Sequence, residues 1–345
     1  MTRRVLLITD APPAKTGTAA WRRYRMIARY FAGNHFAITT LFVSDVTLGA
    51  GAIRWLMATA DHLAICPRTE VEAAARNLDR RDHFDVACAL TPDLAPGLSG
   101  PSRALRVIDL QAPVAEEEQE ALAQRLSTAA LVLTAEPPQT RFVETLGIST
   151  AETPALIDGA RKIRPRLRKS QLLAGTWVEK DETSISATRA FFDEIVARGG
   201  GGAPNFAIAG PGASEISPPP LPFPVTHIDE SLEEMAFYRG LDLAIAPDIE
   251  GSAPRLDVLS ALECGAAPLA SSSALNGLRR RWRLPHFRDL GSMVDFLFNR
   301  GGELRDGGLL TELRARADWT WSGLVTASAR QRERLNREIR ANLPG

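Results

Sequence analysis

The chain has 345 residues, of which 45% are hydrophobic and 24% are charged, and this composition indicates about two globular domains and excludes a disordered chain. Its 41 Lys and Arg residues balance its 41 Asp and Glu residues, so the overall charge predicts no general attraction to nucleic acid. No apolar run is long enough for a signal peptide or for the roughly 18 residues of a membrane span. We therefore expect a cytoplasmic protein whose three cysteines, which lack metal-site spacing, are buried thiols.

The first half of the chain alternates short apolar runs with helical segments. The run RVLLITD, which ends at Asp10, is typical of a strand buried on both faces. A loop follows, and the helix after it carries apolar residues at helical spacing from Trp21 to Phe31. Five further apolar runs continue the series: HFAITTLFVSD, HLAICP, FDVACAL, LRVIDLQA and AALVLTAE. This alternation predicts a parallel sheet with helices on both faces.

The same alternation restarts after a basic segment that contains prolines. Six basic residues lie between Arg161 and Lys169, which is typical of an exposed linker, with an anion-binding patch as the alternative. Strands are expected at LLAGTWV, NFAIAGPG, LDLAIAP and APLASSS, with helices between several of them. We therefore predict an N-terminal Rossmann-like domain at residues 1–160, a linker at 161–170, a C-terminal Rossmann-like domain at 171–317 and a final helix at 318–345.

The stretch from Leu241 to Leu278 resembles the donor-binding signature of GT-B glycosyltransferases, specifically the family 4-like group. In that group a strand that ends in proline leads into G-S-G-x-x-x-K-V-L-E-A-x-A-x-G-x-P-V-V-A and then into a Gly-Leu pair. The matching positions are Pro247, Gly251, Ser252, Val258, Leu259, Ala261, Gly265, Pro268, Gly277 and Leu278. The segments RVLLITDAPPAKTG, LLAGTW and FAIAGPG resemble other strands and loops of the same fold less specifically.

The resemblance implies an α/β protein of two Rossmann-like, doubly wound domains that face each other across a cleft (GT-B), with a C-terminal helix that crosses back to the N-terminal domain. It also implies transfer of a sugar, with retention, from a nucleotide-diphosphate sugar to a hydroxyl acceptor in glycan or surface polysaccharide synthesis. A glycan or lipid-linked acceptor, at most peripheral contact with the inner face of the membrane, and no nucleic acid partner are expected. Neither a cofactor nor a metal is expected, since such enzymes usually work without a divalent cation and the chain has no Asp-x-Asp.

The donor nucleotide is expected at loops and helix N-termini of the C-terminal domain. There free N–H groups and the helix dipole favour a diphosphate, glycines allow its close approach, and a cation stabilises it as it leaves. The predicted donor-binding residues are Gly175, Thr176, Lys180, Gly210, Gly251, Ser252, Arg255 and Ser260. Glu250, preferred over Asp248, is the candidate for the catalytic carboxylate that relatives carry toward the sugar.

The acceptor is expected in the N-terminal domain. Thr16, Gly17 and Thr18 make up the predicted acceptor or phosphate loop after the first strand. Asp109, in LRVIDLQAP, is a candidate catalytic base, with a turn-capping role as the alternative. The helix AAWRRYRMIARYF is basic on one side and aromatic on the other, so we expect it to pack on the core, with contact to an anionic lipid-linked acceptor as the alternative.

Two positions depart from the donor signature. Asp257 stands where the signature has lysine, and Ser260 where it has the glutamate that binds ribose. A carboxylate repels a diphosphate, and a neutral hydrogen bond contributes about 1 kcal/mol where a charged one contributes roughly 1.5–3 kcal/mol. Arg255 could restore the positive charge. These departures support an alternative, a catalytically inactive GT-B scaffold that binds a partner; a sugar-nucleotide epimerase is less favoured, since no set of catalytic acids is evident.

Overall fold

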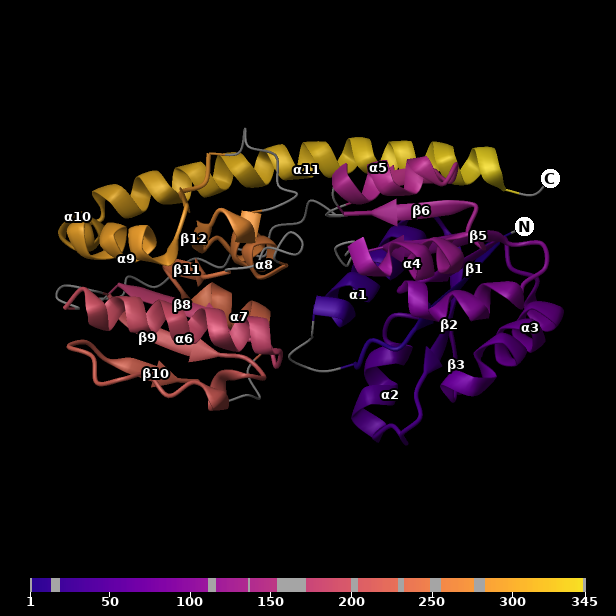
Figure 1. Ribbon diagram of the computed structural model, residues 1–345, viewed down its shortest axis with the longest axis horizontal. Helices are drawn as coiled ribbons and strands as arrows, with labels where there is room; N and C mark the ends of the chain where they lie inside the picture. The colour runs from indigo at the N-terminus through magenta and orange to yellow at the C-terminus, as the bar shows by residue number, and fades with distance from the viewer. Residues whose placement is uncertain are drawn as a thin grey trace. The chain divides into compact units, whose positions relative to one another are not determined.

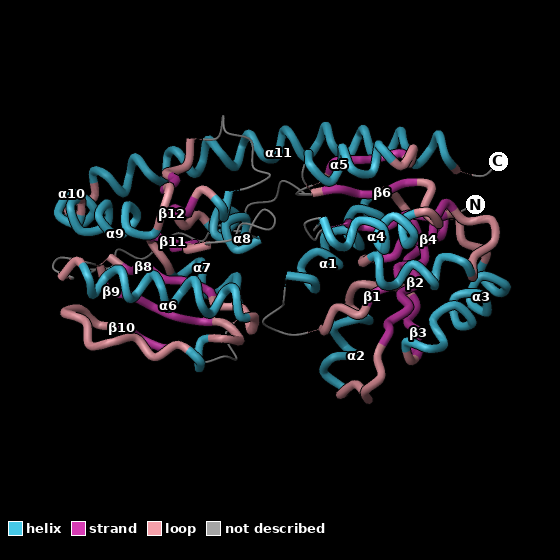
Figure 2. The backbone as a smooth tube through the Cα atoms, viewed as in Figure 1, coloured by secondary structure: helices cyan, strands magenta, loops and turns pink. Residues whose placement is uncertain are grey.

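The computed structural model describes residues 2–13, 19–110, 116–135, 137–153, 172–199, 204–228, 233–248, 256–275 and 283–343 (Figures 1 and 2). The chain divides into two compact units, and each is described by itself. Unit 1 comprises Met1–Asp158 and Thr326–Gly345, and unit 2 comprises Gly159–Val325. The predicted acceptor or phosphate loop at 16–18, the predicted linker at 161–170 and residues 249–255 and 276–278 of the donor signature lie outside the described residues.

Unit 1 contains a sheet of seven parallel strands in the order β3-β2-β1-β4-β5-β6-β7. The strands are β1 (Arg3–Thr9), β2 (Phe36–Val43), β3 (His62–Cys66), β4 (Val86–Ala89), β5 (Leu105–Leu110), β6 (Leu131–Thr134) and β7 (Ser149–Glu152). Both faces of β1 are buried, since Val5 and Leu7 enter one core cluster while Leu6 and Ile8 enter the other. Because successive side chains of a strand point to opposite faces of the sheet, a central strand that is buried on both faces needs an apolar residue at every position.

Helices cover both faces of the unit 1 sheet. The helices are α1 (Ala19–Gly33), α2 (Ala50–Met57), α3 (Val71–Asp82), α4 (Gln119–Leu126) and α5 (Pro137–Thr145), with 3₁₀ turns at Arg68–Glu70, Pro92–Ser99 and Glu116–Glu118. The core cluster of one face includes residues of α1 and α2, and that of the other includes residues of α3, α4 and α5. The expected packing of α1 on the core is therefore correct.

Unit 2 repeats the topology with six parallel strands in the order β10-β9-β8-β11-β12-β13. The strands are β8 (Leu173–Trp177), β9 (Asn205–Ala209), β10 (Val225–His227), β11 (Leu243–Ala246), β12 (Ala267–Ser271) and β13 (His286–Phe287). The helices are α6 (Glu182–Ala197), α7 (Glu234–Gly240), α8 (Leu256–Cys264), α9 (Leu290–Asn299), α10 (Gly301–Arg305) and α11 (Gly308–Asn342), with 3₁₀ turns at Ala213–Glu215 and Ser273–Leu275.

The long helix α11 begins ten residues before the predicted start of the final helix at 318. Its first turns supply Leu309, Leu310 and Leu313 to a core cluster of unit 2. Its last turns supply Leu335 and Ile339 to a core cluster of unit 1. Each unit therefore includes part of this helix in its core.

The three cysteines are buried thiols that form no disulfide, as expected. Burial raises the pKa of the Cys66 and Cys88 thiols, because the apolar surroundings disfavour the thiolate. Among the described residues, no helix has both the length and the apolar character that a membrane crossing requires.

Candidate functional site

The direction of strand succession in unit 2 reverses between β8 and β11, and ligands of doubly wound sheets bind beyond the carboxyl ends of the strands at such a point. Strand β8 pairs with β9 along its whole length, from Leu173 to Trp177. Its pairing with β11 covers only Ala174 and Gly175. The last two residues of β8 therefore have β9 as their partner strand, and the pairing between β8 and β11 ends before their carboxyl ends.

The loops that follow β8 and β9 pack directly on one another. Gly210 has φ +110°, and a Cβ atom there would lie 2.4 Å from the Val178 carbonyl oxygen. A Cβ atom at Gly212 would lie 2.4 Å from the Glu179 carbonyl oxygen. The Gly212 N–H donates to the Val178 carbonyl at 3.0 Å. Glycine is therefore required at 210 for the backbone angle and for the close approach of the two loops.

Two other predicted donor-binding residues lie within the sheet. A Cβ atom at Gly175 would lie 2.8 Å from the Ala207 carbonyl oxygen and 2.9 Å from the Phe237 ring, so this glycine has a packing role. Thr176 is buried beside it. Lys180, in contrast, is exposed beyond the carboxyl end of β8.

The N-terminus of α6, next to Lys180, is capped by the chain's own carboxylate. The Asp181 side chain accepts a hydrogen bond from the Ser184 N–H at 2.7 Å, and the Ser184 hydroxyl accepts one from the Glu179 N–H at 3.0 Å. Glu182 adds a second carboxylate in the first turn. The Asp181 carboxylate caps one of the first N–H groups of the helix, and the two acidic side chains complement its dipole, so this helix end is less favourable for a diphosphate.

The two departures from the donor signature lie inside unit 2. Asp257 is 4% exposed in the first turn of α8, and its carboxylate accepts a hydrogen bond from the Val258 N–H at 2.9 Å. Ser260 is 7% exposed on the same helix. A carboxylate in the first turn of a helix is stabilised by the dipole, and it occupies the part of the helix that would otherwise favour a phosphate.

The serines at the end of β12 brace the neighbouring strand. The Ser273 hydroxyl donates to the main-chain carbonyl of Asp248, just after β11, at 2.7 Å. The Ser271 hydroxyl accepts from the Ala274 N–H at 3.1 Å. Asp248 itself is 3% exposed. The bond between Ser273 and Asp248 holds the carboxyl ends of β11 and β12 together. Helix α8 connects these two strands in the sequence.

Sequence reasoning did not single out Trp177, the last residue of β8. Its indole packs on Phe237, with ring centroids 5.8 Å apart, and is 1% exposed. Its Nε1 atom has no hydrogen-bond partner in the structure as described. Buried indole N–H groups usually have a partner, so this donor is an exception that the described residues do not explain.

In unit 1, Asp109 lies at the end of β5 in a buried ion pair. Arg23 from α1 donates to both carboxylate oxygens, at 2.9 and 2.8 Å, and the two side chains are 5% and 0% exposed. The same guanidinium donates to the Thr153 carbonyl at 2.8 Å and to the Thr153 hydroxyl at 3.0 Å. This network ties α1 to the carboxyl ends of β5 and β7. Arg23 was missed because it is one of several arginines on α1, although its place beside Tyr24 and Ile27 on the apolar face is a signal of a buried partner.

Seven predicted site residues cannot be placed, since they lie outside the described residues: Thr16, Gly17, Thr18, Glu250, Gly251, Ser252 and Arg255. Within the described part of the chain, no group of three His, Cys, Asp or Glu residues is arranged to hold a metal ion.

By sequence, the chain matches no known protein family and no curated protein. By structure, it is similar to Anabaena Alr3699/HepE in complex with UDP and glucose (TM-score 0.70, 10% identity, 98% of this chain and 100% of that one). It is also similar to a UDP-forming α,α-trehalose-phosphate synthase from Burkholderia xenovorans (TM-score 0.65, 12% identity, 99% of each chain). A third similar structure is an α-glucosyltransferase in complex with UDP and a 13-mer DNA containing an HMU base (TM-score 0.64, 10% identity, 93% of this chain and 95% of that one).

These structures correct one expectation. The exclusion of nucleic acid as a partner is wrong, because a protein of this fold has been solved with DNA as well as UDP. A balanced net charge, on which the exclusion was based, says nothing about the local surface that meets an acceptor. The predicted fold class is confirmed: two parallel-sheet α/β units, matched over nearly the whole chain, give this protein the GT-B fold.

Proposed function

We propose that this protein is a glycosyltransferase that transfers a sugar from a nucleotide-diphosphate sugar to a hydroxyl acceptor. The observation that supports this most strongly is the match of both units to GT-B structures that contain UDP, over 98% of the chain in the Anabaena protein. Unit 2 would bind the donor nucleotide, and unit 1 would bind the acceptor. Because the identity is about one residue in ten, the similarity establishes the fold, and the activity is our inference.

The local geometry of unit 2 supports the donor assignment. The short pairing between β8 and β11 leaves the last residues of β8 beside the point where the strand order reverses. Lys180 is an exposed cation beyond this edge. We propose that it contacts the donor, together with the start of α8 and Ser260.

The acid groups of unit 2 predict weak donor binding. Asp257 is buried in the first turn of α8, and Asp181 caps α6, so both of these helix ends already have a resident carboxylate. An incoming diphosphate is then repelled rather than attracted by the side chains at these positions. The same observation supports the second candidate function, a GT-B scaffold that has lost turnover and acts by binding.

The roles of the remaining predicted residues are proposals of the same kind. Glu250 would act on the sugar, and the reaction would retain the configuration at the anomeric carbon. Glycan and surface polysaccharide synthesis in the cytoplasm, at the inner face of the membrane, is the setting that we propose. No metal or other cofactor is included in the proposal.

The first test is a panel of UDP-, GDP-, ADP- and CMP-sugars with the purified full-length chain. A bound ligand at 100 times its dissociation constant raises the free energy of unfolding by about 2.7 kcal/mol, which thermal unfolding detects easily. Release of free nucleotide is then measured with the donor that binds, in the presence of candidate acceptors. Binding with release supports the transferase. Binding without release for any acceptor class supports the scaffold. If millimolar nucleotide does not bind, the assignment of a nucleotide-sugar site to unit 2 is contradicted.

A further inference from the structure

Strand β3 forms one edge of the unit 1 sheet, outside β2 (Figure 2). It pairs with β2 along its whole length, and no other described segment pairs with its outer side. The Ser44 N–H donates to the Cys66 carbonyl at 2.9 Å, so the main-chain groups of Cys66 face β2. Because alternate residues of a parallel strand bond to opposite sides, the main-chain groups of Leu63 and Ile65 face away from β2. This edge therefore presents N–H and C=O groups to which a further strand can bond.

The other three sheet edges are protected in ways that β3 is not. The edge strand β10 directly follows the segment SPPPLPFP at 217–224, whose prolines have no N–H to donate. Strand β13 has only two residues, and the four residues of β7 include Glu152. Prolines, charged side chains and short strands are the usual means by which proteins prevent pairing between exposed edges. Strand β3 has five residues, HLAIC, with no proline and no Lys, Arg, Asp or Glu.

The surface at this edge is also apolar. Ile65 lies in β3 itself, and its side chain is 46% exposed. Val46 is 73% exposed, and it lies two residues after Ser44, which bonds to the end of β3. Leu63 packs against a core cluster of unit 1 and is only partly buried. A strand that paired with this edge would remove apolar side chains from water as well as bond to the main chain.

A second copy of the same chain, related by a two-fold axis, matches the bonding pattern of this edge. Antiparallel pairing centred on Ala64 sets Leu63 of each copy opposite Ile65 of the other. Each of these pairs exchanges both of its main-chain hydrogen bonds, because the groups of both residues face outward. Pairing centred on Ile65 would instead set Leu63 opposite Pro67, which has no N–H. The geometry therefore favours Ala64 as the centre.

The charges that flank β3 suit the same arrangement. Asp61 precedes the strand and Arg68 follows it, separated from it by one residue. Arg68 pairs with Asp10 in its own chain, and its side chain is still 47% exposed. Antiparallel pairing about Ala64 brings Asp61 of each copy next to the segment of the other copy that contains Arg68. Unlike charges then meet at both ends of the paired strands, which is favourable for association.

From this arrangement we infer that two copies of the chain associate through β3 and join their unit 1 sheets into one continuous sheet. The inference goes beyond the proposed function and does not depend on it, because β3 is an outer edge of unit 1 and no nucleotide takes part.

The first test is sedimentation equilibrium of the full-length chain over a range of micromolar concentrations. We expect a molar mass that rises toward twice the 37.4 kDa of one chain. Ile65→Lys should weaken the association by about tenfold or more, because it places a charge on the paired edge. The matched control is Val196→Lys, at a valine of α6 that is 48% exposed, and it should leave the association unchanged.

A disulfide tests the register. Opposite residues of a pair that is not hydrogen-bonded have Cα atoms about 4.5 Å apart, which a disulfide can span. Ala64→Cys, in a Cys66→Ala background that removes the neighbouring thiol, should therefore form a disulfide between two chains under mild oxidation. Val196→Cys in the same background should form none at the same protein concentration.

Several results would overturn the inference. A molar mass of 37.4 kDa at every concentration would show that the chain does not self-associate. A dimer that Ile65→Lys leaves intact, with circular dichroism confirming the fold, would place the interface elsewhere. Failure of Ala64→Cys to cross-link would contradict the pairing about Ala64. If Ile65→Lys does not fold, hydrogen exchange of the wild type decides: protection of the Leu63 and Ile65 amides should rise with protein concentration, and constant protection would contradict the inference.

Discussion

Replacing Asp109 by Asn should destabilise unit 1 strongly. The substitution removes the charge that compensates the Arg23 guanidinium, and the Arg23 side chain is only 5% exposed. Removing one partner of a buried ion pair typically costs about 3–5 kcal/mol, because the remaining charge stays buried. The bonds from Arg23 to Thr153 persist, but they involve neutral acceptors and do not replace the carboxylate.

The measurement is urea-induced unfolding followed by circular dichroism, with a matched surface control. Asp93 pairs with Arg125 at 2.7 Å, and the two side chains are 60% and 50% exposed, so Asp93→Asn should change the free energy of unfolding by less than about 1 kcal/mol. The double variant Arg23→Met/Asp109→Leu should recover most of the stability that Asp109→Asn loses, because an apolar pair has no charge to desolvate.

The competing hypothesis makes the opposite prediction. If Asp109 acts as a catalytic base, Asp109→Asn should abolish turnover and leave the unfolding midpoint close to that of the wild type. A decrease in the free energy of unfolding of less than about 1 kcal/mol would therefore refute the structural role that the buried ion pair indicates.

Three further predictions follow from the donor unit and the buried titratable groups. Asp257→Asn should tighten UDP binding by tenfold or more in a titration, because a carboxylate about 6 Å from a phosphate costs roughly 3 kcal/mol at an effective dielectric constant of 20; unchanged affinity would place the diphosphate away from α8. Gly210→Ala should lower the free energy of unfolding by about 3–5 kcal/mol, because of the positive φ and the clash of the added Cβ. Gly147 also has a positive φ but no atom within 4 Å of an added Cβ, so Gly147→Ala should lower it by roughly 1–2 kcal/mol. Equal losses for the two variants in chemical unfolding would contradict the close packing of the two loops. Burial raises the pKa of the Cys88 thiol and of the Tyr30 phenol. The stability that these neutral groups contribute is therefore complete below their unfolded-state pKa values, about 8.5 and 10, and is lost as the pH rises above those values. A free energy of unfolding that does not change between about pH 8 and pH 11 would contradict this.

The sequence predicts the sheets well where hydrophobic runs are long. RVLLITD becomes β1 with both faces buried, and LDLAIAP becomes β11. The edge strands β10 and β13 were missed, since they span only Val225–His227 and His286–Phe287 and are partly exposed, so neither length nor periodicity marks them. Strand β7, Ser149–Glu152, was missed because its polar residues resemble a loop.

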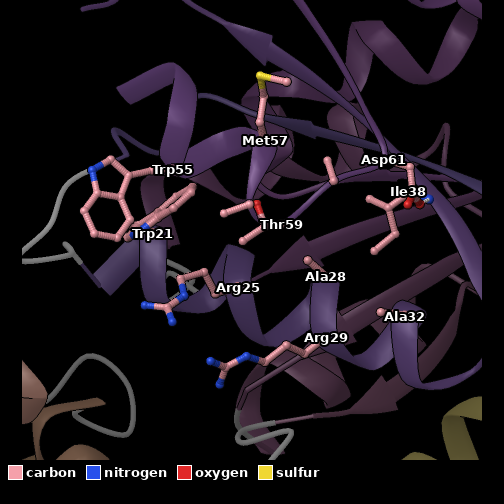
Figure 3. Close-up of a pocket in the computed structure, with 12 residues that line it drawn as sticks. Trp21, Arg25, Ala28, Arg29, Ala32, Ile38, Trp55, Met57, Thr59 and Asp61 are labelled. Carbon is pink, nitrogen blue, oxygen red and sulfur yellow. Dashed lines mark hydrogen bonds between the residues drawn. The ribbon is translucent and has the colours of Figure 1, made fainter. Parts of the chain in front are cut away.

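The candidate site is only partly predictable. Glycine at 210 follows from the close approach of two loops, and its place after a strand is visible in the sequence. The pairing of Arg23 with Asp109 joins residues 86 positions apart, and only the fold brings them together. Unit 1 also has a hollow between α1 and the segment that joins α2 to β3 (Figure 3), and it depends on how these elements pack, which no local pattern specifies.

The most direct test of the central claim is hydrogen–deuterium exchange of the full-length chain with and without saturating UDP. If unit 2 binds the nucleotide as proposed, protection should rise in the β8–α6 loop, in the loop that contains Gly210 and in α8, and the unit 1 sheet should not change. Saturating UDP that protects only unit 1, or that protects neither unit, would contradict the assignment of a nucleotide-sugar site to unit 2.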